Sequence, residues 1–351
     1  MQGGNAMRLT SVTICILAVS ALTACGERSS LPQTIRHAAA SVQPQVVRDA
    51  ATWSRFQIHN FRSGYFPAIV IGPDAAMWLA DTKYHALDRV TTTGKVTAFS
   101  VIGSGFLNPG GLATGSDGKV YAFGGNRSFV RVSTTGHVQE FEIYPAFACG
   151  AGLLGPDGNI WFPTSDGFAT INKFGKITEY PSGVARWGCG SITAGADGGL
   201  WVTNGLYDTI SRIDPNTKTV TQFSAAIMVN GVLHNCSRKY SIASGPDGAL
   251  YYDCDTYLGR MTTAGSTAEV AENSLNFGFS AETLAVGSDG NVWIATRAVG
   301  TIAKYDVTAG VLTYYVSPYR DKPASIAAGV DGNLWIGTDF TYDDVDIFHL
   351  K

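Results

Sequence analysis

The sequence predicts an all-β protein, a seven-bladed β-propeller whose blades are four-stranded antiparallel sheets. A Gly-x-Asp-Gly motif, with Trp or Tyr three residues after it, recurs along the chain every 40 to 50 residues. A period of that length is typical of propellers and other repeat arrays. The composition agrees, because 41 of the 351 residues are glycine and only 15% are charged, which suits a β protein rich in turns.

The N-terminal residues have the features of an export signal. Arg8 precedes an apolar run over residues 12–22, which is too short for a membrane-spanning helix. The residues Leu22-Thr23-Ala24-Cys25 resemble the lipobox of bacterial lipoproteins, in which the leader is removed before an acylated cysteine. We therefore expect residues 1–24 to be a lipoprotein signal peptide and Cys25 to be lipidated. An ordinary secretory signal is the alternative.

Either signal exports the protein, and lipidation would hold it at a bacterial membrane, at the outer membrane or the cell surface. The sequence leaves Met1 and Met7 open as the start. Residues 25–50 are rich in Ser, Gln and Ala without sustained alternation of apolar and polar positions, which predicts a flexible tether. The propeller is expected over residues 51–351.

The charge of the chain limits its partners. The net charge is only −3 and no block of Lys or Arg occurs, so nucleic acid is excluded as an expected partner. Contact with a membrane is expected through the lipid anchor alone. We expect a monomer.

The seven repeats define the units in order. Their first glycines, separated by 43, 40, 40, 50, 42 and 42 residues, are Gly72, Gly115, Gly155, Gly195, Gly245, Gly287 and Gly329. The aromatic residues that follow are Trp78, Tyr121, Trp161, Trp201, Tyr251, Trp293 and Trp335. Because one blade cannot bury both of its faces, these rings are predicted to fill the space between stacked neighbours.

Each unit is predicted to form four short strands, as the third unit illustrates. Strands are predicted over residues 151–154, 159–162, 169–172 and 176–180, with an Asp-Gly turn after the first. Asp-Gly between alternating runs is a strong hairpin signal, because glycine accepts a positive φ without steric cost. The repeated Asp-Gly residues are therefore predicted to be structural.

The two ends of the array predict that the ring closes. The seventh unit ends at Lys351 after a third strand over residues 345–350 and lacks a fourth. Residues 54–58 resemble the fourth strands of other units, such as residues 139–143. The N-terminal segment is thus expected to complete the last blade, which removes exposed sheet edges.

The rim opposite the Asp-Gly turns is the expected functional face. The longest spacing reflects an enlarged loop over residues 225–240, and an insertion on a rigid scaffold is where binding specificity usually resides. This loop, the end of the next second strand and the following blade supply the candidate catalytic residues His234, Asp253, Asp255 and Glu282, with Arg238, Tyr240 and Asp81 as candidate ligand-binding residues. A solvated rim held by a disulfide is the alternative interpretation.

Apart from Cys25, four cysteines follow the predicted signal: Cys149, Cys189, Cys236 and Cys254. An even number in an oxidising compartment suggests two disulfides, for which three connectivities exist. Cys149 and Cys189 occupy equivalent positions in adjacent units, and Cys236 and Cys254 flank one hairpin. These two pairings are favoured. A zinc site is the alternative, but no Cys-x-x-Cys pair supports it.

The repeated motif Gly-Pro-Asp-Gly-Asn-Ile-Trp-Phe is clearest at residues 155–162, and strand endings such as Gly-Lys-Ile-Thr-Glu-Tyr occur at residues 175–180. In these motifs the chain resembles the streptogramin lyase (virginiamycin B lyase) family over about residues 52–351. The resemblance implies a seven-bladed propeller. It also implies magnesium-dependent opening of a cyclic depsipeptide lactone by elimination, with rim histidines and glutamates as acid, base and metal ligands.

The positions where that family carries its site hold other residues here. Its histidine position holds Pro67, Gly110, Gly150, Gly190, Tyr240, Glu282 and Ala324. Its acid position holds Asp81, Gly124, Thr164, Asn204, Cys254, Thr296 and Thr338. Elimination needs a base near the abstracted proton and a cation for the developing charge, so the resemblance predicts the scaffold and not the chemistry.

Two functions follow from the sequence. The first is a lipid-anchored binding module whose channel mouth takes an envelope protein, peptide or glycan. The second is a divergent Mg²⁺-dependent lyase or hydrolase for cyclic esters or depsipeptides, with a site rebuilt from His234, Asp253, Asp255 and Glu282 and with Arg238 holding an anionic group. A propeller of the sugar-lactonase type is a weaker alternative, because that group shares the Asp-Gly-Asn-x-Trp motif.

Overall fold

The computed structural model divides the chain into two compact units, residues 1–41 and 42–351. It describes residues 45–48, 52–58, 68–101, 109–124, 128–143, 148–184, 187, 190–205, 207–236, 241–255, 257–272, 281–296, 300–339 and 344–350. The predicted signal peptide, Cys25 and residues 26–44 of the predicted tether lie outside these ranges. Within them, no helix has the length and apolar character needed to cross a membrane.

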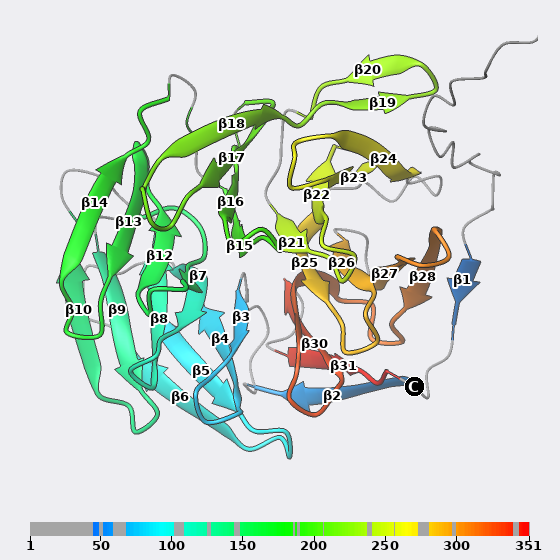
Figure 1. Cartoon of the computed structure of the whole chain (residues 1–351). Helices are drawn as coiled ribbons and strands as arrows, with labels where there is room; N and C mark the ends of the chain where they lie inside the picture. Colours follow the sequence, from blue (N-terminus) through cyan, green and yellow to red (C-terminus); the bar gives the residue numbers. More distant parts are fainter. Residues whose placement is uncertain are drawn as a thin grey trace, which may run out of the picture. The chain divides into compact units, whose positions relative to one another are not determined.

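The second unit is an all-β propeller of seven blades (Figure 1). The first three blades contain β3 (Ile69–Ile71), β4 (Met77–Asp81), β5 (Ala86–Val90) and β6 (Val96–Ser100); β7 (Pro109–Thr114), β8 (Lys119–Gly124), β9 (Ser128–Ser133) and β10 (Val138–Glu142); and β11 (Leu153–Leu154), β12 (Ile160–Pro163), β13 (Gly167–Ile171) and β14 (Ile177–Pro181).

The next three blades follow the same order. They contain β15 (Ile192–Ala194), β16 (Leu200–Thr203), β17 (Thr209–Ile213) and β18 (Val220–Ser224); β21 (Ile242–Ser244), β22 (Leu250–Cys254), β23 (Tyr257–Met261) and β24 (Thr267–Glu272); and β25 (Ala281–Val286), β26 (Val292–Thr296), β27 (Thr301–Asp306) and β28 (Val311–Val316). A separate hairpin, β19 (Ile227–Val229) and β20 (Val232–His234), lies between the fourth and fifth blades in the chain.

The seventh blade closes the ring as the sequence predicted. It is formed by β29 (Lys322–Ala328), β30 (Leu334–Asp339), β31 (Asp344–Phe348) and the N-terminal strand β2 (Trp53–Gln57), which pairs antiparallel with β31. The first strand of each blade contacts the first strand of the next, and β29 contacts β3. The circle of first strands is therefore complete.

One strand lies inside the segment that was predicted to be a tether. Strand β1 (Gln45–Val47) pairs in parallel with β28 and adds a fifth strand to the sixth blade. Residues 45–47 thus belong to the paired backbone of the sixth blade. Only three residues take part, and they show no extended alternation from which the strand could have been predicted.

The hydrophobic core lies between the blades. Each of seven buried clusters combines residues of two neighbouring blades, and each contains one of the seven repeated Trp or Tyr residues, which confirms their predicted place. Between the first two blades, for example, Trp78 and Leu87 share a cluster with Val120 and Val130. The blades are thus held together mainly by burial of apolar surface.

The turn aspartate of the repeat has a structural role in every blade, including the first, where Ala75 follows Asp74 in place of glycine. The turn aspartate accepts a hydrogen bond from the buried ring of its own unit, as in Trp161 Nε1 to Asp157 Oδ1 at 2.8 Å and Tyr251 Oη to Asp247 Oδ2 at 3.1 Å. The donor ring is Trp or Tyr, which explains why both occur at this position. Burial opposes ionisation of Asp197, but hydrogen bonds from Arg212 and Trp201 outweigh it and lower the pKa of that carboxyl.

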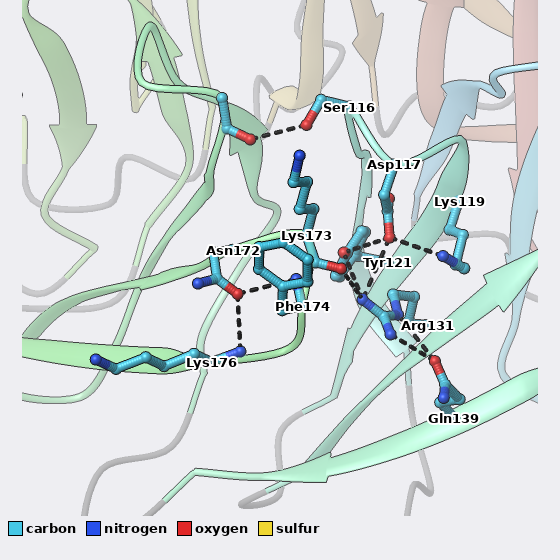
Figure 2. Close-up of polar contacts among 11 residues, drawn as sticks. Ser116, Asp117, Lys119, Tyr121, Arg131, Gln139, Asn172, Lys173, Phe174 and Lys176 are labelled. Carbon is cyan, nitrogen blue, oxygen red and sulfur yellow. Dashed lines mark hydrogen bonds and ion pairs between the residues drawn. The ribbon is translucent and has the colours of Figure 1, made fainter.

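Polar contacts also join neighbouring blades at these turns. Figure 2 shows Arg131 of β9 donating to the backbone oxygen of Lys173 in the next blade at 2.9 Å, while it also contacts Asp117 at 3.2 Å. Ser116 Oγ donates to the backbone oxygen of Gly158 at 2.9 Å. The turn of one blade is therefore fixed against the turn of the next.

Candidate functional site

The enlarged segment after β18 forms a β-hairpin rather than a loop. Strands β19 and β20 pair with Ile227 opposite His234 and Val229 opposite Val232. The turn residues Asn230 and Gly231 have φ of 49° and 82°. Asn-Gly between apolar residues is the typical signal for this two-residue turn, so the hairpin was detectable in the sequence although only a loop was predicted.

The base of the hairpin is fixed to the fifth blade. Cys236 forms a disulfide with Cys254 at the end of β22, with Cα atoms 4.6 Å apart, and this is the pairing that the sequence favoured. Tyr252 Oη donates to the backbone oxygen of Ala225 at 2.9 Å. Burial raises the pKa of this Tyr252 hydroxyl, which therefore stays protonated as a donor.

Two further hydrogen bonds hold both ends of the hairpin. The backbone N–H of Cys236 donates to Asp208 Oδ1 at 2.9 Å, and Thr267 Oγ1 donates to the backbone oxygen of Ala226 at 2.7 Å. Strand β19 contacts β24, the outer strand of the fifth blade, as Figure 1 shows at the top of the propeller. The hairpin is consequently presented in one defined position.

The hairpin buries one set of apolar side chains and exposes another. Ile227 and Val229 are buried in the cluster between the fourth and fifth blades. Met228, Val232 and Leu233 are 55%, 60% and 61% exposed. Residues 225–236 contain no Lys, Arg, Asp or Glu. The free part of the hairpin is therefore an uncharged apolar surface on a rigid support.

Three residues of the predicted polar cluster, which stays a prediction, have described contacts or backbone geometry. His234 meets the ring of Tyr257 edge-on at 5.1 Å between centroids. Asp253 is buried and accepts the backbone N–H of Ser241 at 2.9 Å. Asp255 has a φ of 52° in the turn after β22. His234 therefore packs against a neighbouring ring, and Asp253 holds a backbone N–H group of the fold.

Three other predicted residues lack a described side chain. Glu282 lies in β25, but its side chain is outside the described part of the structure, and Arg238 and Tyr240 lie outside it altogether. Cys149 is disulfide-bonded. Its predicted partner Cys189 also lies outside the described residues, so that pairing stays a prediction.

Described side chains at the family's acid position support the blade ends. Asp81 is buried, and its Oδ1 accepts the backbone N–H groups of Lys83 and Tyr84, each at 2.9 Å. Thr296 Oγ1 donates to the backbone oxygen of Thr301 at 2.6 Å, and the hydroxyl of Thr338 donates to that of Asp344 at 2.9 Å. These side chains brace the loops between second and third strands.

Within the described ranges, the residues do not fit the magnesium ion that the resemblance implies. Magnesium is bound through carboxylate oxygens in near-octahedral geometry. Over the described ranges, no group of three or more His, Cys, Asp or Glu side chains is arranged to hold a metal ion. We therefore derive no catalytic step through such an ion.

Comparisons with known proteins agree with the fold. The model of the virginiamycin B lyase family matches residues 33–227 and 188–345. Virginiamycin B lyase from Staphylococcus aureus superposes with a TM-score of 0.71 at 20% identity, covering 85% of this chain and 99% of that one. A streptogramin B lyase structure gives 0.71 at 21% identity, covering 85% and 97%.

A propeller with another role is also similar. The structure of YCF48 bound to D1 peptide superposes with a TM-score of 0.65 at 11% identity, covering 88% of this chain and 99% of that one. Identities this low establish the fold alone. No curated protein matches the chain.

Proposed function

The chain belongs to the virginiamycin B lyase family, and we propose that it uses the family's propeller as an envelope-anchored binding module whose contact surface is the hairpin β19–β20. One observation carries this proposal. Met228, Val232 and Leu233 project into solvent from a base that a disulfide and buried hydrogen bonds hold in place. The predicted lipidation of Cys25 supplies the anchor.

Physical properties of the hairpin favour a role in binding. Large apolar side chains gathered on the surface of a soluble domain are unfavourable in water, so such groups commonly mark interaction sites. A preorganised hairpin loses little conformational entropy on association. Met228 adapts to irregular apolar partners because its side chain is unbranched and polarizable. An apolar segment of an envelope protein or peptide fits this surface best.

Site-specific photo-crosslinking in cells tests the proposal. A photoreactive phenylalanine analogue placed at Leu233 should form an adduct with a defined envelope partner, and Met228→Ser should reduce the adduct. The matched control places the same probe at Val330, which is 53% exposed in the turn of the seventh blade. Equal adducts at Leu233 and Val330, or none at Leu233, would refute the hairpin as the contact surface.

Membership of the family favours one second candidate, a divergent lyase or hydrolase acting on cyclic esters or depsipeptides. Asp253 Oδ1 already accepts the backbone N–H of Ser241, so this oxygen has a structural role. Incubation of the purified chain with magnesium and a cyclic depsipeptide would decide. Turnover that is lost in Glu282→Gln would establish the enzyme, and absence of turnover on any cyclic ester would leave the binding module.

A further inference from the structure

A second exposed feature lies in the third blade, at the turn between β13 and β14. Phe174 is 81% exposed there. Asn172 Oδ1 accepts the backbone N–H groups of Phe174 and Lys176, each at 3.0 Å. Gly175 has a φ of 88° and lies directly against the ring of Phe141. The aromatic ring is therefore held out into solvent by a well-defined turn.

The fold does not require an aromatic residue at this position. Equivalent turns occur in three other blades. In each, the backbone N–H of the turn glycine donates the same hydrogen bond, at 2.8, 2.9 and 2.8 Å. The position of Phe174 is occupied there by Thr93, Thr135 and Ala264. The same turn thus forms around small side chains. Phe174 contributes surface rather than core, and its exposure needs another explanation.

Positive charge surrounds the exposed ring. Lys173 Nζ lies 5.2 Å from the ring centre of Phe174, and Lys176 follows the turn glycine (Figure 2). Lys95 occupies the position of Lys176 in the first blade and is also exposed. Residues 91–95, 133–137 and 172–176, which form these turns in the first three blades, contain no Asp or Glu. This edge of a net negative chain is therefore locally cationic.

We propose that the turn of Phe174, Lys173 and Lys176 docks onto an anionic lipid bilayer. Aromatic rings and lysines favour the membrane interface, with the ring at the boundary between headgroups and acyl chains and the ammonium groups among the phosphates. A cationic patch is a common additional membrane contact beside a lipid anchor. The turn adds a contact to the one expected from Cys25.

The docking surface and the hairpin are separate. The turn of Phe174 belongs to the third blade, whereas β19 contacts β24 of the fifth blade. The inference does not depend on the proposed function, since the two surfaces share no residue.

Vesicle co-sedimentation tests the proposal with the chain from residue 25 onward carrying Cys25→Ser, so that no acyl chain contributes. The compact unit begins at Val42, before its first strand, so this chain retains the whole propeller. Binding is expected to vesicles of phosphatidylcholine mixed with phosphatidylglycerol and to weaken with salt. Lys173→Gln with Lys176→Gln should weaken it roughly 25-fold, at about fivefold for each lysine.

Two variants separate the ring from the charges. Phe174→Ser should also weaken binding to the mixed vesicles, whereas the matched control Val330→Ser should not. Three outcomes would each overturn the proposal. They are equal binding to pure phosphatidylcholine, absence of binding to any vesicle, and binding to polyglutamate but not to vesicles. Because Phe174→Ser leaves the hairpin intact, crosslinking at Leu233 in that variant distinguishes a failure here from a failure of the proposed function.

Discussion

Arg55 Nε donates a hydrogen bond of 2.7 Å to Asp346 Oδ1 and so ties the closing strand β2 to β31. The same guanidinium contacts Asp344 at 2.9 Å and also Asp321, and it lies 4.1 Å from the ring centre of Tyr319. All three carboxylates are buried. One guanidinium therefore contacts three acidic groups at the point where the ring closes.

Removal of this cation should destabilise the propeller strongly. Arg55→Gln leaves buried carboxylates without their partner, and breaking a buried ion pair in this way typically costs about 3–5 kcal/mol in the free energy of unfolding. Urea denaturation followed by tryptophan fluorescence measures the change. The control is Arg212→Gln, whose partner Asp197 and whose own side chain are partly exposed, and for which about 0–1 kcal/mol is expected.

Stability should rise as the pH falls from 7 towards 5. Burial, opposed by the hydrogen bond from Arg55, raises the pKa of Asp346 to about 6. The folded chain thus binds a proton more readily than the unfolded chain, so this contribution is present at low pH and is lost as the pH rises through 6. Asp346→Asn should flatten the dependence in this window, as urea midpoints measured at a series of pH values would show.

Below about pH 4 the turn aspartates should reverse the trend. Burial of Asp74 and Asp247 opposes their ionisation, but hydrogen bonds from Arg89 and Arg260 outweigh it and lower the pKa of both carboxyls. Their contribution is present at neutral pH and is lost as they become protonated on acidification. Asp247→Asn should make the acid limb less steep, and an unchanged limb would contradict this assignment.

Most of the fold could be predicted because its signals are local and repeated. The Asp-Gly turn and its aromatic residue recur in one stretch of chain, and their spacing sets the number of blades. Closure by residues 53–57 followed from the missing last strand. Strand β1 has no such signal, since its three residues are placed by tertiary pairing with β28 alone.

The candidate site was less predictable, because sequence spacing does not give the direction of a side chain. Asp253 and Asp81 sit where a polar rim was expected, yet each is buried against backbone N–H groups. Phe174 was not singled out, although comparison of the equivalent turn positions in the blades would have found it. The exposed face of the hairpin depends on how β19 packs against β24.

Loss of the hairpin disulfide should loosen the rim without opening the ring. The bond joins residues separated by 18 positions, for which about 3 kcal/mol of stabilisation is expected. Cys236→Ser with Cys254→Ser should lower the melting temperature and increase amide hydrogen exchange in β19 and β20. Exchange in β2 and β31 should stay unchanged; a rise there would show that the disulfide supports the whole ring.

Two glycine substitutions test the contact between Gly175 and the ring of Phe141, which supports the turn of Phe174. Gly175→Ala places a Cβ atom 2.5 Å from the ring of Phe141, in addition to the cost of a positive φ. Gly118→Ala has a similar φ of 73° and open space around it. The backbone cost of about 1–2 kcal/mol is common to both, so thermal denaturation should show the larger loss for Gly175→Ala. Equal losses would mean that Phe141 moves aside freely.

The parallel pairing of β1 with β28 has a mechanical consequence. Tension applied to the chain before residue 45 reaches β1 before it reaches β2, because β1 comes first in the chain. The three paired residues of β1 must separate from β28 before any load acts on the closing strand. Strand β1 therefore bears the applied load first, which protects the circular closure when the N-terminal end is pulled.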